Sequence, residues 1–263
     1  MMRKLTLGLL AIGSVALTSQ NSFAQKWADL KMTIVLTGDA PKLADLKVTD
    51  PGCGQQTVAA ETLVVSPSNK GIANVVFTLD TRKKKLKASD IHPELSKVPS
   101  TKPVLDNVKC VFVPHVLTMR AGQTLEVKNS DTVSHNAKMA FFENKEVNPV
   151  IPANSSVEIK TDVEERAPTP VECNVHPWMK AWVFVTSHPY TGVSDENGVL
   201  TISKLPAGMP LDFRIWHESQ DKSIQEVVVG GKKENWAKGV TTLELKEGMN
   251  DLGKIEIDVS RFR

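Results

Sequence analysis

The sequence predicts an all-β protein, because short apolar alternations separated by turn residues recur along almost the whole chain beyond its first 24 residues. Apolar side chains occupy every second position in residues 32–36, 75–79 and 157–159, a pattern typical of strands with one buried face. Gly-containing turn signals separate such runs, as at 37–39 and 121–123. Short strands with short connections favour a β-sandwich architecture.

The first 24 residues have the features of a secretory signal. Arg3 and Lys4 form a charged start, residues 5–17 an apolar stretch, and Ser22-Phe23-Ala24 a small-x-small cleavage site. No Cys lies near that site to carry a lipid anchor, and no later apolar run approaches the roughly 18 residues of a membrane span. We therefore expect a soluble periplasmic or secreted protein that begins near Gln25.

The charge balance of the exported chain is close to neutral. Lys and Arg number 32 against 30 Asp and Glu, and two of the basic residues belong to the predicted signal. The basic run at 82–85 is interpreted as a solvated loop. This composition gives no indication of nucleic-acid binding.

Four residues in two segments offer a soft metal-ligand set. Cys173, His176 and Met179 stand in Cys-Asn-Val-His-Pro-Trp-Met, and His135 stands upstream in Val-Ser-His-Asn. A thiolate, two imidazoles and a thioether are the ligands of a trigonal copper site with a weak axial sulfur. Zinc is the less suitable ion, because a thioether is a poor zinc ligand. The other histidines are expected to be structural or solvated: His92, His115, His188 and His217.

The string Cys-x-x-His-Pro-aromatic-Met with an upstream His-Asn resembles the ligand loop of the cupredoxins, in the form found in amicyanin and plastocyanin. The resemblance implies a Greek-key sandwich that holds one type 1 copper ion. It implies His135, Cys173 and His176 as equatorial ligands and Met179 as the axial ligand. Asn136 would join the two ligand segments from outside the coordination sphere.

Two neighbours of the motif carry further expectations. Trp178 lies between the His and the Met, where it either packs under the site or belongs to an apolar patch by which a redox partner protein docks. Pro168 and Pro170 precede Cys173. Since proline cannot donate to a strand ladder, we expect this segment to be an edge strand or a bulge.

The three cysteines divide into one metal ligand and one pair. With Cys173 assigned to copper, Cys53 and Cys110 remain, and an oxidising compartment favours their pairing. We therefore predict a Cys53–Cys110 disulfide.

The chain is expected to form two domains after the signal peptide at 1–24. We assign residues 25–187 to the cupredoxin-like domain, with 25–107 adding strands to the same sandwich and a short helical turn near 89–96. Residues 188–263 form a small β-sandwich that resembles transthyretin-like, fibronectin-like or Ig-like domains, including the regulatory domain of carboxypeptidases and the middle domain of rhamnogalacturonan lyases. This second resemblance rests on turn chemistry and implies fold rather than function.

The combined interpretation is an exported type 1 copper protein that transfers single electrons between redox partners. We do not expect an enzyme, because the sequence shows neither a recognisable nucleophile–base pair nor paired carboxylates in a motif. Two alternatives stay open. The protein could store or deliver copper in the periplasm, or it could be a carbohydrate-binding or cell-envelope module whose second domain binds a glycan.

Overall fold

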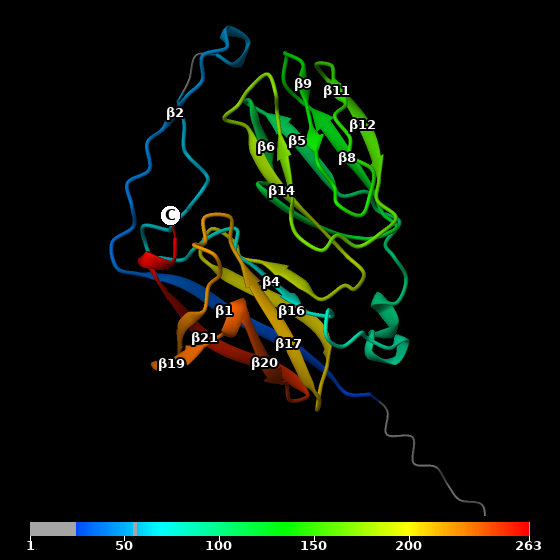
Figure 1. Cartoon of the computed structure of the whole chain (residues 1–263), viewed down its shortest axis with the longest axis vertical. Helices are drawn as coiled ribbons and strands as arrows, with labels where there is room; N and C mark the ends of the chain where they lie inside the picture. The colour runs from blue at the N-terminus through cyan, green and yellow to red at the C-terminus, as the bar shows by residue number, and fades with distance from the viewer. Residues whose placement is uncertain (1–24, 55–56, 263) are drawn as a thin grey trace, which may run out of the picture.

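The structure is a computed structural model that describes residues 25–54 and 57–262, so the predicted signal peptide lies outside the described residues. Figure 1 shows two bodies built of strands, one above the other. The described residues form strands and short 3-10 turns without an α-helix, which confirms the all-β prediction. Within these residues, no helix is long and apolar enough to cross a membrane.

The first sandwich, drawn in green in the upper half of Figure 1, consists of two four-stranded sheets over one core. Alternation places Ala181, Val183 and Val185 in this core, while the side chains between them point to the opposite face. One sheet contains β10 (Lys138–Met139), β13 (Thr169–Glu172), β14 (Lys180–Thr186) and β7 (Val116–Arg120). The other contains β12 (Ser155–Lys160), β8 (Thr124–Asn129), β5 (Val104–Val108) and β6 (Val111–Val113). A separate pair joins β9 (His135–Asn136) to β11 (Val150–Ile151).

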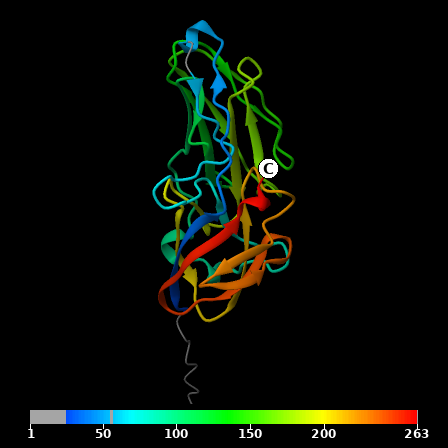
Figure 2. The same ribbon diagram turned by 90° about the vertical axis from the view of Figure 1, so that its left-hand side faces the viewer.

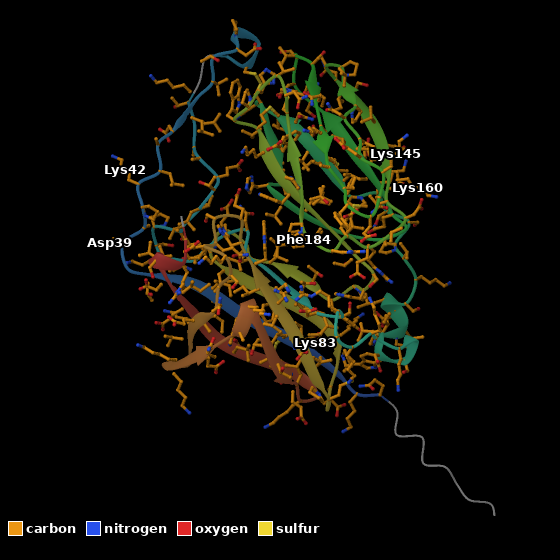
Figure 3. All side chains as sticks on the ribbon, viewed as in Figure 1. Asp39, Lys42, Lys83, Lys145, Lys160 and Phe184 are labelled. Atoms are coloured by element: carbon orange, nitrogen blue, oxygen red, sulfur yellow. A yellow bond between two sulfur atoms is a disulfide. The ribbon has the colours of Figure 1, made fainter. Side chains whose placement is uncertain are left out.

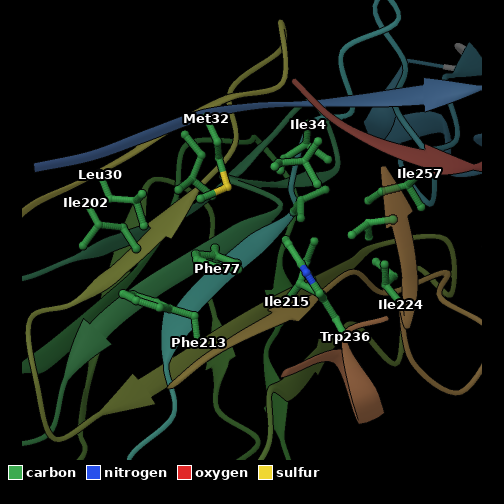
Figure 4. Close-up of a cluster of buried hydrophobic side chains, with 14 of the residues drawn as sticks. Leu30, Met32, Ile34, Phe77, Ile202, Phe213, Ile215, Ile224, Trp236 and Ile257 are labelled. Carbon is green, nitrogen blue, oxygen red and sulfur yellow. The ribbon is translucent and has the colours of Figure 1, made fainter. Parts of the chain in front are cut away.

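The second sandwich encloses its own apolar core, in which the rings of Phe77 and Phe213 stack with centroids 4.9 Å apart (Figure 4). Its larger sheet has the order β16 (Val199–Pro206), β1 (Trp27–Thr37), β21 (Gly248–Asp258), β18 (Glu226–Val229) and β19 (Lys232–Asn235). Its smaller sheet has the order β15 (Thr191–Val193), β4 (Val76–Leu79), β17 (Pro210–Trp216) and β20 (Val240–Glu244).

The strand pairing contradicts the expectation that residues 25–107 complete the first sandwich. Strand β1 pairs with β16 and β21, and β4 pairs with β15 and β17, so both belong to the second sandwich. The alternating face of β1, with Leu30, Met32 and Ile34, is buried in that core. The first sandwich is therefore inserted: the chain enters it at β5 and leaves it after β14. Alternation predicted these strands correctly, but it does not specify a partner.

Between β1 and β4 the chain makes an excursion to the first sandwich, along the left side of Figure 1. It contains β2 (Leu46–Lys47), the 3-10 turn η1 (Pro51–Cys53) and β3 (Thr57–Val58), with β2 paired to β3. Viewed from the side in Figure 2, this part of the chain runs along the first sandwich. Cys53 is buried in the core of that sandwich. We call residues 46–54 the strap.

Aromatic side chains join the two sandwiches. Trp216 of β17 lies edge-on to Trp182 and to Phe184 of β14, with ring centroids 5.1 and 5.0 Å away. Figure 3 shows Phe184 between the two bodies. A polar contact lies beside these rings, because the Trp182 indole donates to Oε2 of Glu218 over 3.1 Å.

The helical turn expected near 89–96 is divided. Residues Ala88–Asp90 and Pro93–Leu95 form two separate 3-10 turns, η2 and η3. His92 between them is extended, with φ −54° and ψ 136°, because a following proline disfavours the α conformation.

The prolines predicted an edge strand or a bulge, and β13 is an edge strand only at its first two residues. It pairs with β14 along its whole length and also with β10 on its other side. The pairing with β10 covers only Val171 and Glu172, so Pro170 lies beyond the end of β10. The missing N–H therefore falls where β10 offers no partner, and the proline is accommodated.

Candidate metal centre

A tight loop between β13 and β14 carries three of the predicted ligands. Cys173 follows β13 directly, and Met179 directly precedes β14. The Met179 amide donates to the carbonyl of His176 over 2.9 Å, and the Cys173 amide donates to the carbonyl of Met179 over 3.3 Å. These bonds close the loop, so that Cys173 and His176 face the same point.

The fourth predicted ligand, His135, comes from β9 and meets this loop. Its Nδ1 lies 2.9 Å from Nδ1 of His176, and Sγ of Cys173 lies 3.7 Å from the same His176 nitrogen. One ligand atom from each of the three residues falls within 4.8 Å of the others. All three side chains are buried, with at most 3% of their surface exposed. The arrangement can hold one small cation out of contact with bulk water.

Met179 is buried in the same apolar cluster as Cys173. The side chain of Met179 is therefore in contact with the core of the first sandwich and not with solvent. Its service as an axial ligand stays a prediction.

Asn136 links the two ligand segments through its side chain. Its Oδ1 accepts from the Asn174 amide at 2.8 Å and from the Cys173 thiol at 3.4 Å. Its Nδ2 donates to Oδ1 of Asn148 over 2.6 Å. Asn136 therefore fixes the position of the Cys173 thiol, and its role beside a bound metal stays a prediction.

Two carboxylates that the sequence analysis did not single out face the outer nitrogens of the imidazoles. Oδ2 of Asp131 lies 2.9 Å from Nε2 of His135, and Oδ2 of Asp50 lies 3.2 Å from Nε2 of His176. Asp131 precedes its histidine by four positions, a weak signal in an irregular segment. Asp50 is 126 positions from its partner and comes from the strap, so the sequence contains no local signal for it.

One turn of backbone connects these parts. Lys109 and Cys110 have φ values of 53° and 57°, and their amides donate to the Asp131 carboxylate over 2.6 and 2.8 Å. Cys110 forms the predicted disulfide with Cys53, with Cα atoms 5.8 Å apart, which confirms that pairing. The turn therefore fastens the strap to the segment that carries His135.

Trp178 supports the site by packing. Its ring centroid lies 5.1 Å from that of His176, and its indole donates to the carbonyl of Cys110 over 3.0 Å. His176 itself is covered, since Asp50 contacts its Nε2 and Sγ of Cys53 lies 3.7 Å from that atom. Of the two roles expected for Trp178, these contacts favour packing under the site over a place in an exposed docking patch. The exposed apolar side chain nearest in sequence is Val175, at 61%.

The electrostatic environment favours the ligating form of His135. Burial lowers the pKa of His135 and outweighs the opposing effect of the Asp131 carboxylate, so the imidazole stays neutral at neutral pH. Hydrogen bonds from His176 and from the Gly52 amide lower the pKa of Asp50 and keep it ionised. Neutral imidazole is the form that binds metals.

The four other histidines lie elsewhere. Within the part of the chain that the structure describes, the groups of adjacent metal-binding side chains all include residues of this one site. His115 contacts Glu218 and lies 3.4 Å from Glu61, as a hydrogen-bonded structural histidine would. His188 and His217 are buried, and His92 is half-buried and accepts from the Glu94 amide.

Comparison with known proteins gives partial likenesses only. No family model and no curated protein matches the chain. Among solved structures, a Cu-containing nitrite reductase (NirK) from Thermus scotoductus SA-01 is 19% identical over 36% of this chain, with a TM-score of 0.31. A mutant of amicyanin in its oxidized state is 18% identical over 32% of this chain and 81% of its own, with a TM-score of 0.29. A purple cupredoxin from Nitrosopumilus maritimus is 21% identical over 32% of this chain and 100% of its own, with a TM-score of 0.28.

The chain spans about a quarter of the length of the nitrite reductase. TM-scores of this size do not establish a family for the whole chain. The chemistry of the site therefore rests on its own residues.

Proposed function

We propose that this protein binds one copper ion in a type 1 site and transfers single electrons between redox partner proteins outside the cytoplasm. The observation that carries the proposal is the convergence of two imidazole nitrogens 2.9 Å apart with the buried thiol of Cys173, 3.7 Å from one of them. Such a set of soft and imidazole donors suits an ion that alternates between two oxidation states.

The donor set fits a cation. Each imidazole has its Nε2 against a carboxylate, so a proton on Nε2 leaves the two Nδ1 lone pairs facing each other. Lone pairs at that separation repel unless a positive charge lies between them. The nearby thiol can provide negative charge, because a metal-bound cysteine is deprotonated.

Copper suits these residues better than zinc. His135, Cys173 and His176 would be the equatorial ligands, and the buried Met179 would be the axial one. A thioether is a poor ligand for structural zinc but a usual weak ligand in blue-copper sites. Bound copper would supply a one-electron couple, and Asn136 and the carboxylates would hold its ligands in one geometry in both states.

Burial of the donors favours electron transfer over storage or delivery. A delivery protein must release its ion, yet the three donor side chains are almost fully buried and the strap covers His176. An electron can leave such a site by tunnelling while the ion stays in place. The partner would approach near the exposed Val175 in the ligand loop.

The test is to load the purified mature protein with Cu(II) and record its visible absorption and metal content. We expect one copper per chain and an intense visible band from thiolate-to-copper charge transfer, which disappears on reduction and returns on oxidation. A protein that retains one tightly bound zinc in preference to copper, or binds copper without this band, would contradict the proposal.

A further inference from the structure

The carboxylate of Asp50 has its two oxygens committed to different partners. Oδ1 accepts from the Gly52 amide at 2.7 Å, within the turn that the strap forms at η1. Oδ2 faces Nε2 of His176 at 3.2 Å. An ionised carboxylate only accepts hydrogen bonds, so this contact is favourable only when Nε2 of His176 carries the proton.

That proton determines which nitrogen of His176 is free. A neutral imidazole has one N–H and one lone pair, and the hydrogen bond of one nitrogen fixes the role of the other. With the proton on Nε2, the lone pair of Nδ1 points toward Nδ1 of His135 and the Cys173 thiol. Asp131 likewise favours a proton on Nε2 of His135, which lies 2.9 Å from its Oδ2, and so leaves Nδ1 of His135 with the lone pair.

The strap is held closely enough for this role. The Cys53–Cys110 disulfide fixes it three residues beyond Asp50. Gly52 lies so near Val133 that a Cβ at this position would stand 2.1 Å from Cγ1 of that valine. Only the absence of a side chain allows the turn to approach the first sandwich without displacing Val133.

We propose that Asp50 is a positioning residue of the metal centre: delivered by a strap from the second sandwich, it holds His176 with Nδ1 unprotonated and directed at the metal. The inference rests on the proposed function for the identity of the metal. It adds that the centre is completed by a segment outside the sandwich that carries the ligands. Asp131 and Asp50 then have the same role, each toward one histidine: Asp131 belongs to the first sandwich, and Asp50 belongs to the strap.

The decisive variant is Asp50→Asn, because asparagine preserves the shape of the side chain. Its carbonyl oxygen can keep the bond from the Gly52 amide, which places the NH₂ group opposite Nε2 of His176. An amide donor requires a lone pair there, so the variant should move the proton of His176 to Nδ1, the ligating nitrogen. Asp106→Asn is the matched control, since Asp106 accepts from Ser130 and contacts no imidazole.

The readout is the tautomer of His176 in the apoprotein, measured by ¹H–¹⁵N NMR of the imidazoles at about pH 8, above their ordinary titration range. We expect the Nε2–H form in the wild type and the Asp106→Asn control, and the Nδ1–H form in Asp50→Asn. Copper affinity of Asp50→Asn should fall about 10–100-fold, as for other partners of metal-ligating histidines. Thiol counting on each protein shows that the disulfide, and with it the strap, is retained.

An Nδ1–H form in the wild type, or an unchanged tautomer in Asp50→Asn, would overturn the inference. If the tautomers behave as expected while the wild type binds no copper, the positioning role is supported and the proposed function is refuted. The two failures are therefore distinguishable.

Discussion

The Nδ1 atoms of His135 and His176 lie 2.9 Å apart although the residues are separated by 41 positions in the sequence. They approach because β9 and the loop before β14 meet at one end of the first sandwich, and because a carboxylate holds the far side of each ring. With both imidazoles protonated at Nε2, their Nδ1 lone pairs face each other in a buried site, which is unfavourable unless a cation lies between them. The proposed copper ion would remove that repulsion.

Replacement of Cys173 by Ser should abolish the intense visible band of the copper-loaded protein, because a hydroxyl cannot supply the thiolate that gives rise to it. Absorption spectra of the wild type and the variant after identical loading check this. Asp106→Asn, which leaves all three cysteines and the strap in place, is the control and should keep the band. An unchanged band in Cys173→Ser would show that this thiol is not a ligand.

Met179→Leu should leave copper bound and raise the reduction potential, since His135, Cys173 and His176 supply the strong bonds and the axial thioether mainly tunes the metal. Spectroelectrochemistry measures the shift. Met139→Leu is the matched control, because Met139 is another buried methionine of the same core. Loss of copper from Met179→Leu alone would mean that the thioether is a strong ligand and that the trigonal description is wrong.

Removing the disulfide by Cys53→Ser/Cys110→Ser should lower the free energy of unfolding by about 4 kcal/mol in the chain-entropy account of a loop of this size. The bridge spans 57 positions. Denaturant unfolding of the apoprotein compares the variant with the wild type, and Cys173→Ser serves as a cysteine control without a bridge. Thiol counting on the unfolded, unreduced wild type should find one free thiol; three would refute the pairing in solution.

The stability of the protein should fall as the pH rises from about 6.5 to about 9. Burial disfavours the charged form of His115, but the adjacent carboxylates of Glu218 and Glu61 outweigh it and raise the pKa of His115 to about 9. The folded state thus binds a proton that the unfolded state releases above about pH 6.5. The resulting stabilisation is complete below that pH, on the order of 3 kcal/mol, and is lost through pH 9.

Thermal unfolding of the apoprotein across this range measures the slope. Glu218→Gln should flatten it, while Glu196→Gln, at an exposed position, should not. An equal slope in all three proteins would mean that the contact between His115 and Glu218 is not an ion pair.

On the acid side, His188 should destabilise the folded state as the pH falls from about 6.5 to about 4. Burial lowers the pKa of His188 to about 4, so the unfolded state binds a proton in this range and the folded state does not. The loss amounts to on the order of 3 kcal/mol by pH 4. His188→Gln should reduce the dependence of Tm on pH in this range.

His92→Gln is the control for His188→Gln. Nδ1 of each histidine accepts from the backbone amide two residues later, but His92 is only half-buried. If both variants change the acid slope equally, burial of His188 is not its cause.

The sequence predicted the features that depend on residues close together in the chain. The loop from Cys173 to Met179 is local, so its residue types and spacing indicated the donors, and His135 was recognised by its neighbour Asn136. The cysteine pairing followed from counting. Pro170 predicted an edge strand, and the prediction fails only beyond Pro170, where β10 pairs with Val171 and Glu172.

Long-range partners could not be predicted in this way. Apolar alternation in β1 established a buried face, yet nothing in the strand itself indicates that it lies between β16 and β21. Asp50 has no motif around it, since its role arises only when the strap reaches the first sandwich. The spacing of residues in a motif cannot identify a side chain that orients the site from a distant segment.

The bridge between the strap and Cys110 has a consequence for how the chain can be cut. The first sandwich is joined to the second by the segments before β5 and after β14, and the strap adds a covalent bond between them. Cleavage of both segments by a protease would yield three fragments, and the two that carry Cys53 and Cys110 would still migrate together on a non-reducing denaturing gel. These two fragments would separate only after a reductant opens the bridge, because the disulfide closes the backbone between Cys53 and Cys110 into a covalent loop.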